Sequence, residues 1–273
     1  MMACCKDSTI RVGLGVWRNP NWIGSFYPNN TKPQYMLETY SETFNTVEGN
    51  STFHATPPIE RLRSWATRTP DHFKFSFKFP QNITHKKKLY EVDEEIHLFL
   101  ALLAEIRPKV GTIMIQLPPS FDSSLMNRLL RLKNVLPPTF NYAIEFRHSD
   151  FFIDPHLEIY NLIRDGVFSL VILDNRLSAN NTSHSDKRKD PISIDPGQNP
   201  IVRYVDTDGS YDTGRINAWG ECLKHWKKEG RKPSFFAHTE SDNFAPHIAK
   251  MVYNKIWGID DDIRFCSPHL NIF

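Results

Sequence analysis

Strand-like and helix-like segments alternate along the whole chain, and this alternation limits the possible folds more than any other feature. Eight segments read as strands: 11–17, 44–50, 73–79, 112–117, 141–147, 167–174, 201–205 and 234–238. Helical segments follow them near 33–42, 58–68, 92–105, 123–133, 155–164, 215–229 and 243–254. Strict alternation predicts a parallel sheet, which can be an open doubly wound sheet or a closed barrel.

The spacing of the strands favours a single (β/α)8 barrel, the TIM barrel. The residues that mark successive strand ends are 29 to 38 positions apart. Each interval has room for a loop, a helix and a strand, but none has room for a second domain. The length of 273 residues also suits one barrel. We therefore predict a flexible N-terminus over residues 1–9 and one barrel domain over residues 10–273.

A long polar loop is predicted between strands six and seven, from Asn175 to Pro200. It is rich in Asn, Ser, Asp, Lys and Pro. Two interpretations are open, because βα loops of a barrel lie over the active face and can act as lids, while polar loops of this length are commonly disordered. The composition favours a disordered insertion.

The alternation inside two strands predicts which side chains point into the barrel. In 73–79 every second residue is Phe, and these Phe side chains need the apolar layer that the helices provide. Lys78 is then directed inward. The same argument applied to 141–147 directs Glu145 and Arg147 inward.

Polar residues at the other strand ends complete a ring of candidate site residues, among which Asp174 and Arg203 are also predicted to point inward. We interpret Glu48 and Glu145 as the catalytic acid or base. The predicted substrate-binding residues are Trp17, Asn50, Lys78, Gln116, Arg147, Asp174, Arg203 and His238.

This ring has two interpretations, because charge inside a barrel is costly unless it is paired. One is a network of salt bridges that only closes the barrel, with Glu145 against Arg147 or Arg203 and Glu48 against Lys78. The other is a substrate site at the C-terminal face of the barrel. The number of charged and amide side chains on separate strands exceeds what packing requires, which favours a site.

A metal site is an alternative interpretation of the same ring. Carboxylates and imidazole suit zinc or manganese, and the ligand types present are Glu48, Glu145, Asp174 and His238. However, three cations of the ring would compete with a metal ion for the same space. We therefore expect a metal-free anion site. We also expect no cofactor, because Gly13-x-Gly15 is followed by Arg18 where a dinucleotide fingerprint has Gly.

Charge and hydropathy bear on partners and location. The formal net charge of +2 is nearly balanced, which argues against a protein that coats DNA. No apolar run is long enough to span a bilayer, and the first ten residues lack the apolar region of a signal peptide. We expect a cytoplasmic protein without a membrane partner.

Several motifs together resemble the YecE-like family, a domain of unknown function. They are Gly13-x-Gly15-x-Trp17, Trp22 with Phe26-Tyr27-Pro28, Phe44-x-x-Val47-Glu48 with Asn50-Ser51-Thr52-Phe53, Trp65 with Thr69-Pro70, Phe73-x-Phe75-x-x-Lys78, Ile83-Thr84-His85, Gln116-Leu117-Pro118-Pro119-Ser120-Phe121 and Glu145-Phe146-Arg147-His148. The resemblance implies a TIM-barrel fold and no particular activity.

The chain departs from the pattern of that family at strands seven and eight. The family tends to continue the strand-seven Arg into Leu-His-Gly, whereas Arg203 is followed here by Tyr204-Val205-Asp206. Strand eight tends to end in Phe-Asn-Asn, whereas here it reads Phe236-Ala237-His238. These changes put a substrate shared with the family in doubt on that side of the barrel.

Two hypotheses for function follow. In the first, the protein is a hydrolase or isomerase of a small anionic or sugar-like substrate, in which Lys and Arg side chains hold the negative charge. In the second, it is a non-catalytic protein that binds an anionic metabolite or a nucleic-acid phosphate at the same place. A thermal-shift screen of ligands would separate the ligand classes.

Overall fold

The computed structural model describes residues 9–153, 157–175, 195–207 and 211–259. Within them, eight strands form one parallel sheet: β1 (Arg11–Leu14), β2 (Thr46–Gly49), β3 (Lys74–Phe77), β4 (Thr112–Gln116), β5 (Asn141–Glu145), β6 (Ser169–Asn175), β7 (Ile201–Asp206) and β8 (Ser234–Thr239). Each lies where the sequence predicts a strand.

The sheet curves into a nearly closed barrel. Its strand order is β3-β2-β1-β8-β7-β6-β5-β4, with parallel pairing throughout. The first and last strands of this order meet at the isolated bridges Phe75↔Val110 and Lys78↔Met114. The backbone N–H of Phe79 also donates to the carbonyl oxygen of Met114 at 3.0 Å. The predicted (β/α)8 barrel is confirmed.

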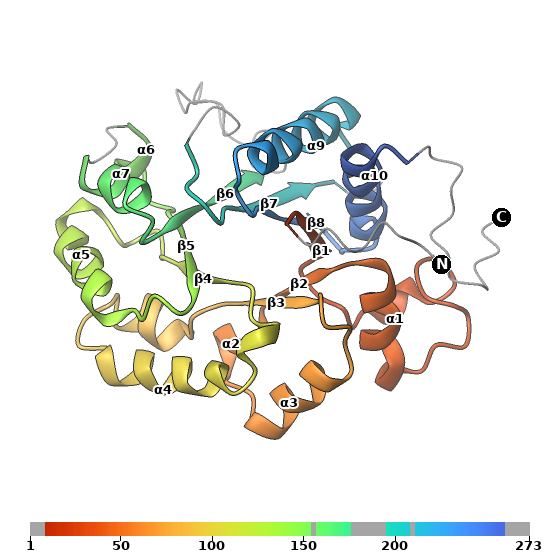
Figure 1. Ribbon diagram of the computed structural model, residues 1–273, viewed down its shortest axis with the longest axis horizontal. Coiled ribbons are helices and arrows are strands. Elements are labelled where there is room, and N and C mark those ends of the chain that lie inside the picture. The colour runs from red at the N-terminus through yellow and green to blue at the C-terminus, as the bar shows by residue number, and fades with distance from the viewer. Residues whose placement is uncertain (1–8, 154–156, 176–194, 208–210, 260–273) are drawn as a thin grey trace.

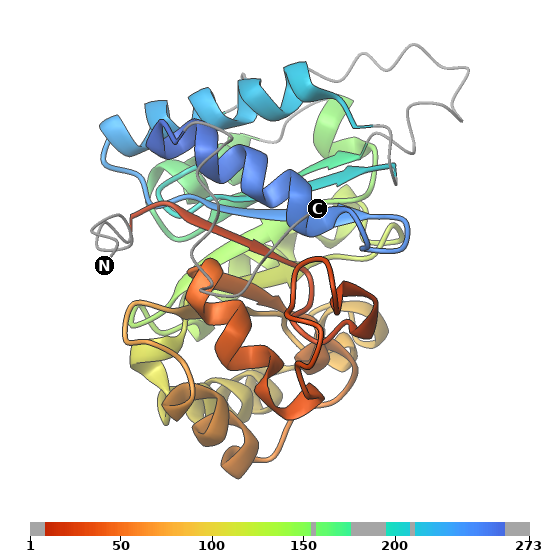
Figure 2. The same cartoon turned by 90° about the vertical axis from the view of Figure 1, so that its right-hand side faces the viewer.

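Helices surround the strands in chain order, as Figure 1 shows. They are α1 (Met36–Thr43), α2 (Ser51–His54), α3 (Ile59–Thr67), α4 (Asp93–Ala104), α5 (Met126–Val135), α6 (Asp150–Ile153), α7 (Leu157–Arg164), α9 (Thr213–Lys228) and α10 (Ala245–Trp257). Figure 2 shows α9 and α10 side by side, and α10 also packs on β1 and β8.

Local sequence explains where the last two helices begin and end. The carboxylate of Asp212 accepts a hydrogen bond from the backbone N–H of Arg215 at 2.9 Å and so caps the start of α9. In α10, Pro246 occupies the first turn, where no intrahelical N–H is needed. Gly258 ends that helix in the left-handed conformation, with φ of 64°, which glycine adopts without strain.

Two apolar cores lie on the two faces of the strands. The larger one fills the space between strands and helices and includes Phe73, Phe75, Phe77 and Phe79, as the alternation of strand three predicts. A separate inner cluster comes from the opposite face of five strands and consists of Met114, Ala143, Val171, Ile201 and Phe236. The barrel interior is thus packed rather than hollow.

Some predicted boundaries differ from the structure. β1 ends at Leu14 rather than Trp17, and the short helices α2 and α6 follow strand ends where no helix is predicted. Most of the predicted polar loop, residues 176–194, lies outside the described residues. The flexible segment 1–9 and the single domain 10–273 stay predictions, because residues 1–8 and 260–273 lie outside them too. No helix in the described part is long and apolar enough to cross a membrane, and the cytoplasmic location remains a prediction.

Candidate functional site

A ring of polar side chains lies directly above the inner apolar cluster. On β4, β5, β7 and β8, the residues two positions after the apolar ones are Gln116, Glu145, Arg203 and His238. Side chains two residues apart share one face of a strand, so these four must also point into the barrel. With Glu48, Lys78 and Arg147 they form what we call the mouth ring, at the C-terminal ends of the strands.

Glu48 is the centre of one half of the mouth ring. Its Oε1 lies 2.8 Å from Nζ of Lys78, an ion pair without the alignment of a hydrogen bond. Its Oε2 lies 3.1 Å from Nε of Arg203 and 3.0 Å from Nε2 of His238. One carboxylate therefore holds side chains from β7 and β8 and from the end of β3.

Glu145 is the centre of the other half. Nε of Arg147 donates to its Oε1 at 2.6 Å, and Nη1 of Arg203 donates to its Oε2 at 3.1 Å. The amide Nε2 of Gln116 lies 3.0 and 2.9 Å from the two oxygens. Arg203 contacts both Glu48 and Glu145, so it joins the two halves into one network.

In the mouth ring the negatively charged side chains are buried and the positively charged ones are partly exposed. The side chains of Glu48 and Glu145 are 0% exposed, whereas those of Lys78, Arg203 and Arg147 are 7%, 12% and 33% exposed. The acids are covered, and the cations are what reaches the surface. The ring contains three cations and two carboxylates, which leaves an excess of positive charge before His238 is considered.

Both carboxylates are ionised despite complete burial. Burial acts to raise the pKa of Glu48, but Arg203, Lys78 and His238 together hold that pKa well below its usual range. Burial opposes Arg203, Arg147 and Gln116 in the same way at Glu145, whose pKa is also lowered. In turn, Glu48 and Glu145 outweigh burial and raise the pKa of Arg203. At neutral pH Glu48, Glu145 and Arg203 are therefore all charged.

Asn50, a further predicted site residue, lies near the mouth ring and holds backbone in place. Nδ2 of Asn50 donates to the carbonyl oxygen of Gly15 at 2.9 Å, which joins the chain after β2 to the chain after β1. His238 lies against the same glycine, since a Cβ at Gly15 would stand 2.3 Å from its Cε1. Only a residue without a side chain leaves room for this imidazole.

Asp174 is not part of the ring, and its predicted inward orientation is wrong. Its Oδ2 accepts hydrogen bonds at 2.7 Å from Nε of Arg215 and from Nε1 of Trp219, both on α9. The side chain thus faces the helix layer. Leu173, which pairs with Arg203 in the sheet and is 36% exposed, has the parity that points to the mouth.

Trp17 also lies elsewhere than a ring residue would. Its indole packs edge to face on Trp65 of α3 at 5.0 Å between centroids, and on Phe75 at 6.2 Å. Phe75 belongs to the face of β3 that meets the helices. Trp17 therefore joins the aromatic layer between strands and helices.

The side chains considered as metal ligands do not form one cluster. Arg203 lies between Glu48 and Glu145, and Asp174 faces α9. Among the residues that the structure describes, no group of three or more His, Cys, Asp or Glu side chains is arranged to hold a metal ion.

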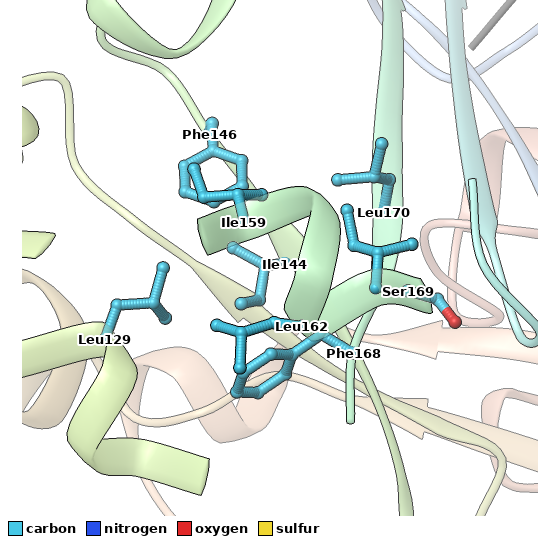
Figure 3. A pocket seen from close by; sticks show the side chains of 9 residues that line it. Leu129, Ile144, Phe146, Ile159, Leu162, Phe168, Ser169 and Leu170 are labelled. Atoms are coloured by element: carbon cyan, nitrogen blue, oxygen red, sulfur yellow. The ribbon is translucent and has the colours of Figure 1, made fainter. Parts of the chain in front are cut away.

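An apolar cavity lies outside the strand layer and is separate from the mouth ring. It is lined by Leu129, Ile144, Phe146, Ile159, Leu162, Ile163, Phe168, Ser169 and Leu170. Figure 3 shows these side chains converging from β5, α5, α7 and β6. The lining has no charged group to orient a polar substrate, so we interpret the cavity as a packing gap beneath α7.

Comparison with known proteins was made by sequence and by structure. A family model described as "Protein of unknown function DUF72" matches residues 11–260. The UPF0759 protein YecE of Escherichia coli strain K12 is 30% identical over 274 residues, which cover 96% of this chain and 95% of that protein. The UPF0759 protein YunF of Bacillus subtilis strain 168 is 30% identical over 156 residues, 55% of this chain and 54% of that one.

Two solved structures of DUF72 family proteins have the same fold. One, from Enterococcus faecalis V583, superposes with a TM-score of 0.70 at 19% identity and covers 90% of this chain and 95% of that one. The other, from Thermotoga maritima MSB8, has a TM-score of 0.66 at 20% identity, with 91% and 99% covered. The family match and the relative YecE, whose resemblance the motifs had indicated, establish that this chain belongs to the DUF72 family of proteins of unknown function.

Proposed function

We propose that the mouth ring binds a small anionic or sugar-like ligand, and that the protein acts on it as a hydrolase or isomerase. The observation that carries this proposal is the order of exposure in the ring. Two ionised carboxylates are fully covered, while Lys78, Arg203 and Arg147 are increasingly exposed. A ligand that enters from solvent meets positive charge first, in a site of low dielectric where charge is felt strongly.

Arg147 provides the donors that an anion needs. Its Nε is used by Glu145. Its two terminal nitrogens make no hydrogen bond to any residue that the structure describes, and its side chain is 33% exposed. A guanidinium held at one nitrogen and free at the other two can bind carboxylate or phosphate through two parallel bonds.

His238 supplies the proton transfer that hydrolases and isomerases require. Its Nε2 is 3.0 Å from Oε2 of Glu48, and its Nδ1 is 4.0 Å from Oδ1 of Asp242. Its side chain is 13% exposed, so it is fixed yet reachable. An imidazole oriented by a carboxylate is a common general acid or base. In this proposal Glu48 and Glu145 position the reactive and charged groups.

A second candidate is a non-catalytic protein that binds an anionic metabolite or a nucleic-acid phosphate. One observation favours it over a reaction in which Glu48 or Glu145 is the acid or base, as the sequence predicts: every carboxylate oxygen of these two residues already contacts a cation, an imidazole or an amide. Neither acid has an oxygen open to a substrate proton. In this case Arg147 and Arg203 bind the ligand and no reaction follows.

The anion site is tested with inorganic sulfate as the probe. Wild type, Arg147→Met and Arg63→Met are titrated with sulfate at constant ionic strength, by calorimetry and by thermal shift. Arg63 is a matched control, since it pairs with Glu105 on the surface and is 57% exposed. We expect Arg147→Met to weaken sulfate binding at least tenfold, because a charge-assisted bond contributes about 1.5 to 3 kcal/mol. Equal affinity in all three proteins would contradict an anion site at the ring.

Catalysis is tested after a ligand is found. A thermal-shift screen of phosphosugars, sugar acids and nucleotides identifies compounds that compete with sulfate, and each is then incubated with enzyme and followed by NMR. Turnover that is lost in His238→Asn while binding is retained supports the hydrolase or isomerase. Binding without turnover of any ligand supports the second candidate.

A further inference from the structure

His85 lies at the mouth of the barrel but is not part of the mouth ring. It is in η4 (Asn82–Lys86), a single π-helical turn that comes shortly after Lys78 at the end of β3. Segments that follow barrel strands lie over the C-terminal face, where the mouth ring is. Short π-helical turns also occur frequently at functional sites.

The imidazole of His85 is fixed in place, yet one of its nitrogens is unused. Its Nδ1 lies 2.9 Å from Oγ1 of Thr84, a buried residue. Its ring meets the ring of Phe53 edge to face, with 4.9 Å between centroids and 82° between planes. The remaining nitrogen, Nε2, makes no hydrogen bond to any residue in the described part of the chain. The side chain is half-buried, so a small ligand can reach it.

Charged groups of the mouth ring act on this imidazole from the ends of β3 and β5. Burial lowers the pKa of His85, Arg147 and Lys78 lower it further, and Glu145 acts in the opposite direction. Its own segment adds Lys86 and Lys87, and the neighbouring helix α2 carries His54. The balance keeps His85 neutral at neutral pH, in an environment of net positive charge.

We propose that His85 is a further residue of the anion site. Its imidazole binds the ligand through Nε2 and takes up a proton from solvent when the anion binds. This inference rests on the proposed function. An anion beside Arg147 offsets the positive charge that keeps the imidazole neutral, and protonation turns Nε2 into a donor toward the anion.

The two binding events are reciprocal. If a bound anion makes protonation of His85 easier, protonation must strengthen anion binding by the same factor. The sign follows directly: anion affinity rises as pH falls through the pKa of His85 and is lowest when the imidazole is neutral. The gain is limited to about tenfold per pH unit, since one proton is involved.

His72 is a matched internal control. It immediately precedes β3, whereas His85 follows the same strand, so the two lie at opposite ends of the barrel. His72 is also half-buried, and its pKa is likewise lowered, by burial and by Lys109 and Lys74. A nonspecific effect of salt would move both residues, whereas an anion at the mouth ring would move His85 alone.

The experiment is an NMR titration of the imidazole resonances, with and without saturating sulfate at matched ionic strength. Sulfate is chosen because it keeps the same charge across the titration. His85→Gln and His72→Gln assign the two signals. We expect sulfate to raise the pKa of His85 and to leave that of His72 unchanged. Calorimetry should show that His85→Gln removes part of the pH dependence of sulfate affinity and His72→Gln none.

The outcomes separate this inference from the proposal on which it rests. Sulfate binding that depends on Arg147 but leaves the pKa of His85 unchanged would overturn the role of His85 and keep the anion site. Equal shifts at His85 and His72 would also overturn it, since screening would then explain both. Absence of saturable sulfate binding would overturn the anion site and the role of His85 together.

Discussion

Glu145 and Asp174 are two acids at the ends of neighbouring strands, and their different surroundings show what defines the candidate site. Each is buried and bound to Arg. Glu145 points into the barrel and holds Arg147, Arg203 and Gln116. Asp174 points outward and fixes α9. A polar residue at a strand end therefore does not mark a site unless it also lies on the inner face.

The largest expected effect is that of Glu145→Gln. The change removes one of the two completely buried carboxylates and leaves Arg203 and Arg147 under-compensated. Breaking a buried pair from one side costs about 3 to 5 kcal/mol. We expect a loss of that size in the free energy of unfolding, measured by urea denaturation.

Sulfate should partly reverse this loss. In Glu145→Gln, an anion can take the place of the missing carboxylate between the two guanidinium groups, so sulfate should stabilise the variant more than wild type. A loss below about 1 kcal/mol would show that water reaches the ring freely. An equal response of both proteins to sulfate would show that anions bind elsewhere.

Acid should destabilise the wild-type protein through Glu48 and Glu145. The folded-state pKa values of Glu48 and Glu145 lie below their ordinary values, so both groups stabilise the fold above an unfolded-state pKa of about 4.3. That stabilisation is lost as pH falls through the lowered values. We expect the free energy of unfolding to fall below about pH 4, and Glu145→Gln to show a shallower fall. Parallel pH profiles would contradict this assignment.

Asp174→Asn should have a smaller effect and a different one. The amide can still accept a hydrogen bond from Trp219, but the ion pair with Arg215, whose side chain is 16% exposed, is lost. We expect a loss of about 2 kcal/mol. Sulfate affinity should not change, because Asp174 faces α9. A change in sulfate affinity as large as that of Arg147→Met would show that Asp174 contributes to the anion site as well.

The strand positions, the barrel and the inward orientation of Lys78, Glu145 and Arg203 could be predicted from sequence. Strand three alternates Phe with polar residues, so only one parity buries the aromatic rings. The pattern of strand six does not indicate which face is buried, since both of its faces are largely apolar, and Asp174 falls on the outer one. The prediction that Asp174 points inward is wrong for that reason.

The contacts of the mouth ring could be predicted only in part. The pairing of Glu145 with Arg147 or Arg203 could be predicted. That Arg203 also contacts Glu48 could not, because residues 155 positions apart meet only through closure of the barrel. Gly15 carries no chemistry of its own, and a glycine near a strand end has many explanations. Its place under His238 is visible only when β1 and β8 are adjacent.

Gly15→Ala should have the smallest effect on stability and a specific effect on the site. The new methyl group would stand 2.3 Å from Cε1 of His238, so the imidazole must move away from Glu48. The ring can turn toward the open mouth, so we expect a loss of only about 1 kcal/mol, at the low end for an added methyl group. NMR should show His238 freed from its partner, with a changed imidazole chemical shift.

Gly220→Ala is the control for this change, because it also forces a side chain to move. Its methyl group would stand 2.5 Å from Cγ and 2.9 Å from Cβ of Lys255, so α10 must shift slightly away from α9. Inside α9, alanine also favours the helix by about 1 kcal/mol over glycine. We expect the shift of α10 to offset this gain, and the His238 signal to stay unchanged in this variant. If Gly15→Ala also leaves His238 in place, then the backbone yields instead of the imidazole, and Gly15 does not position His238.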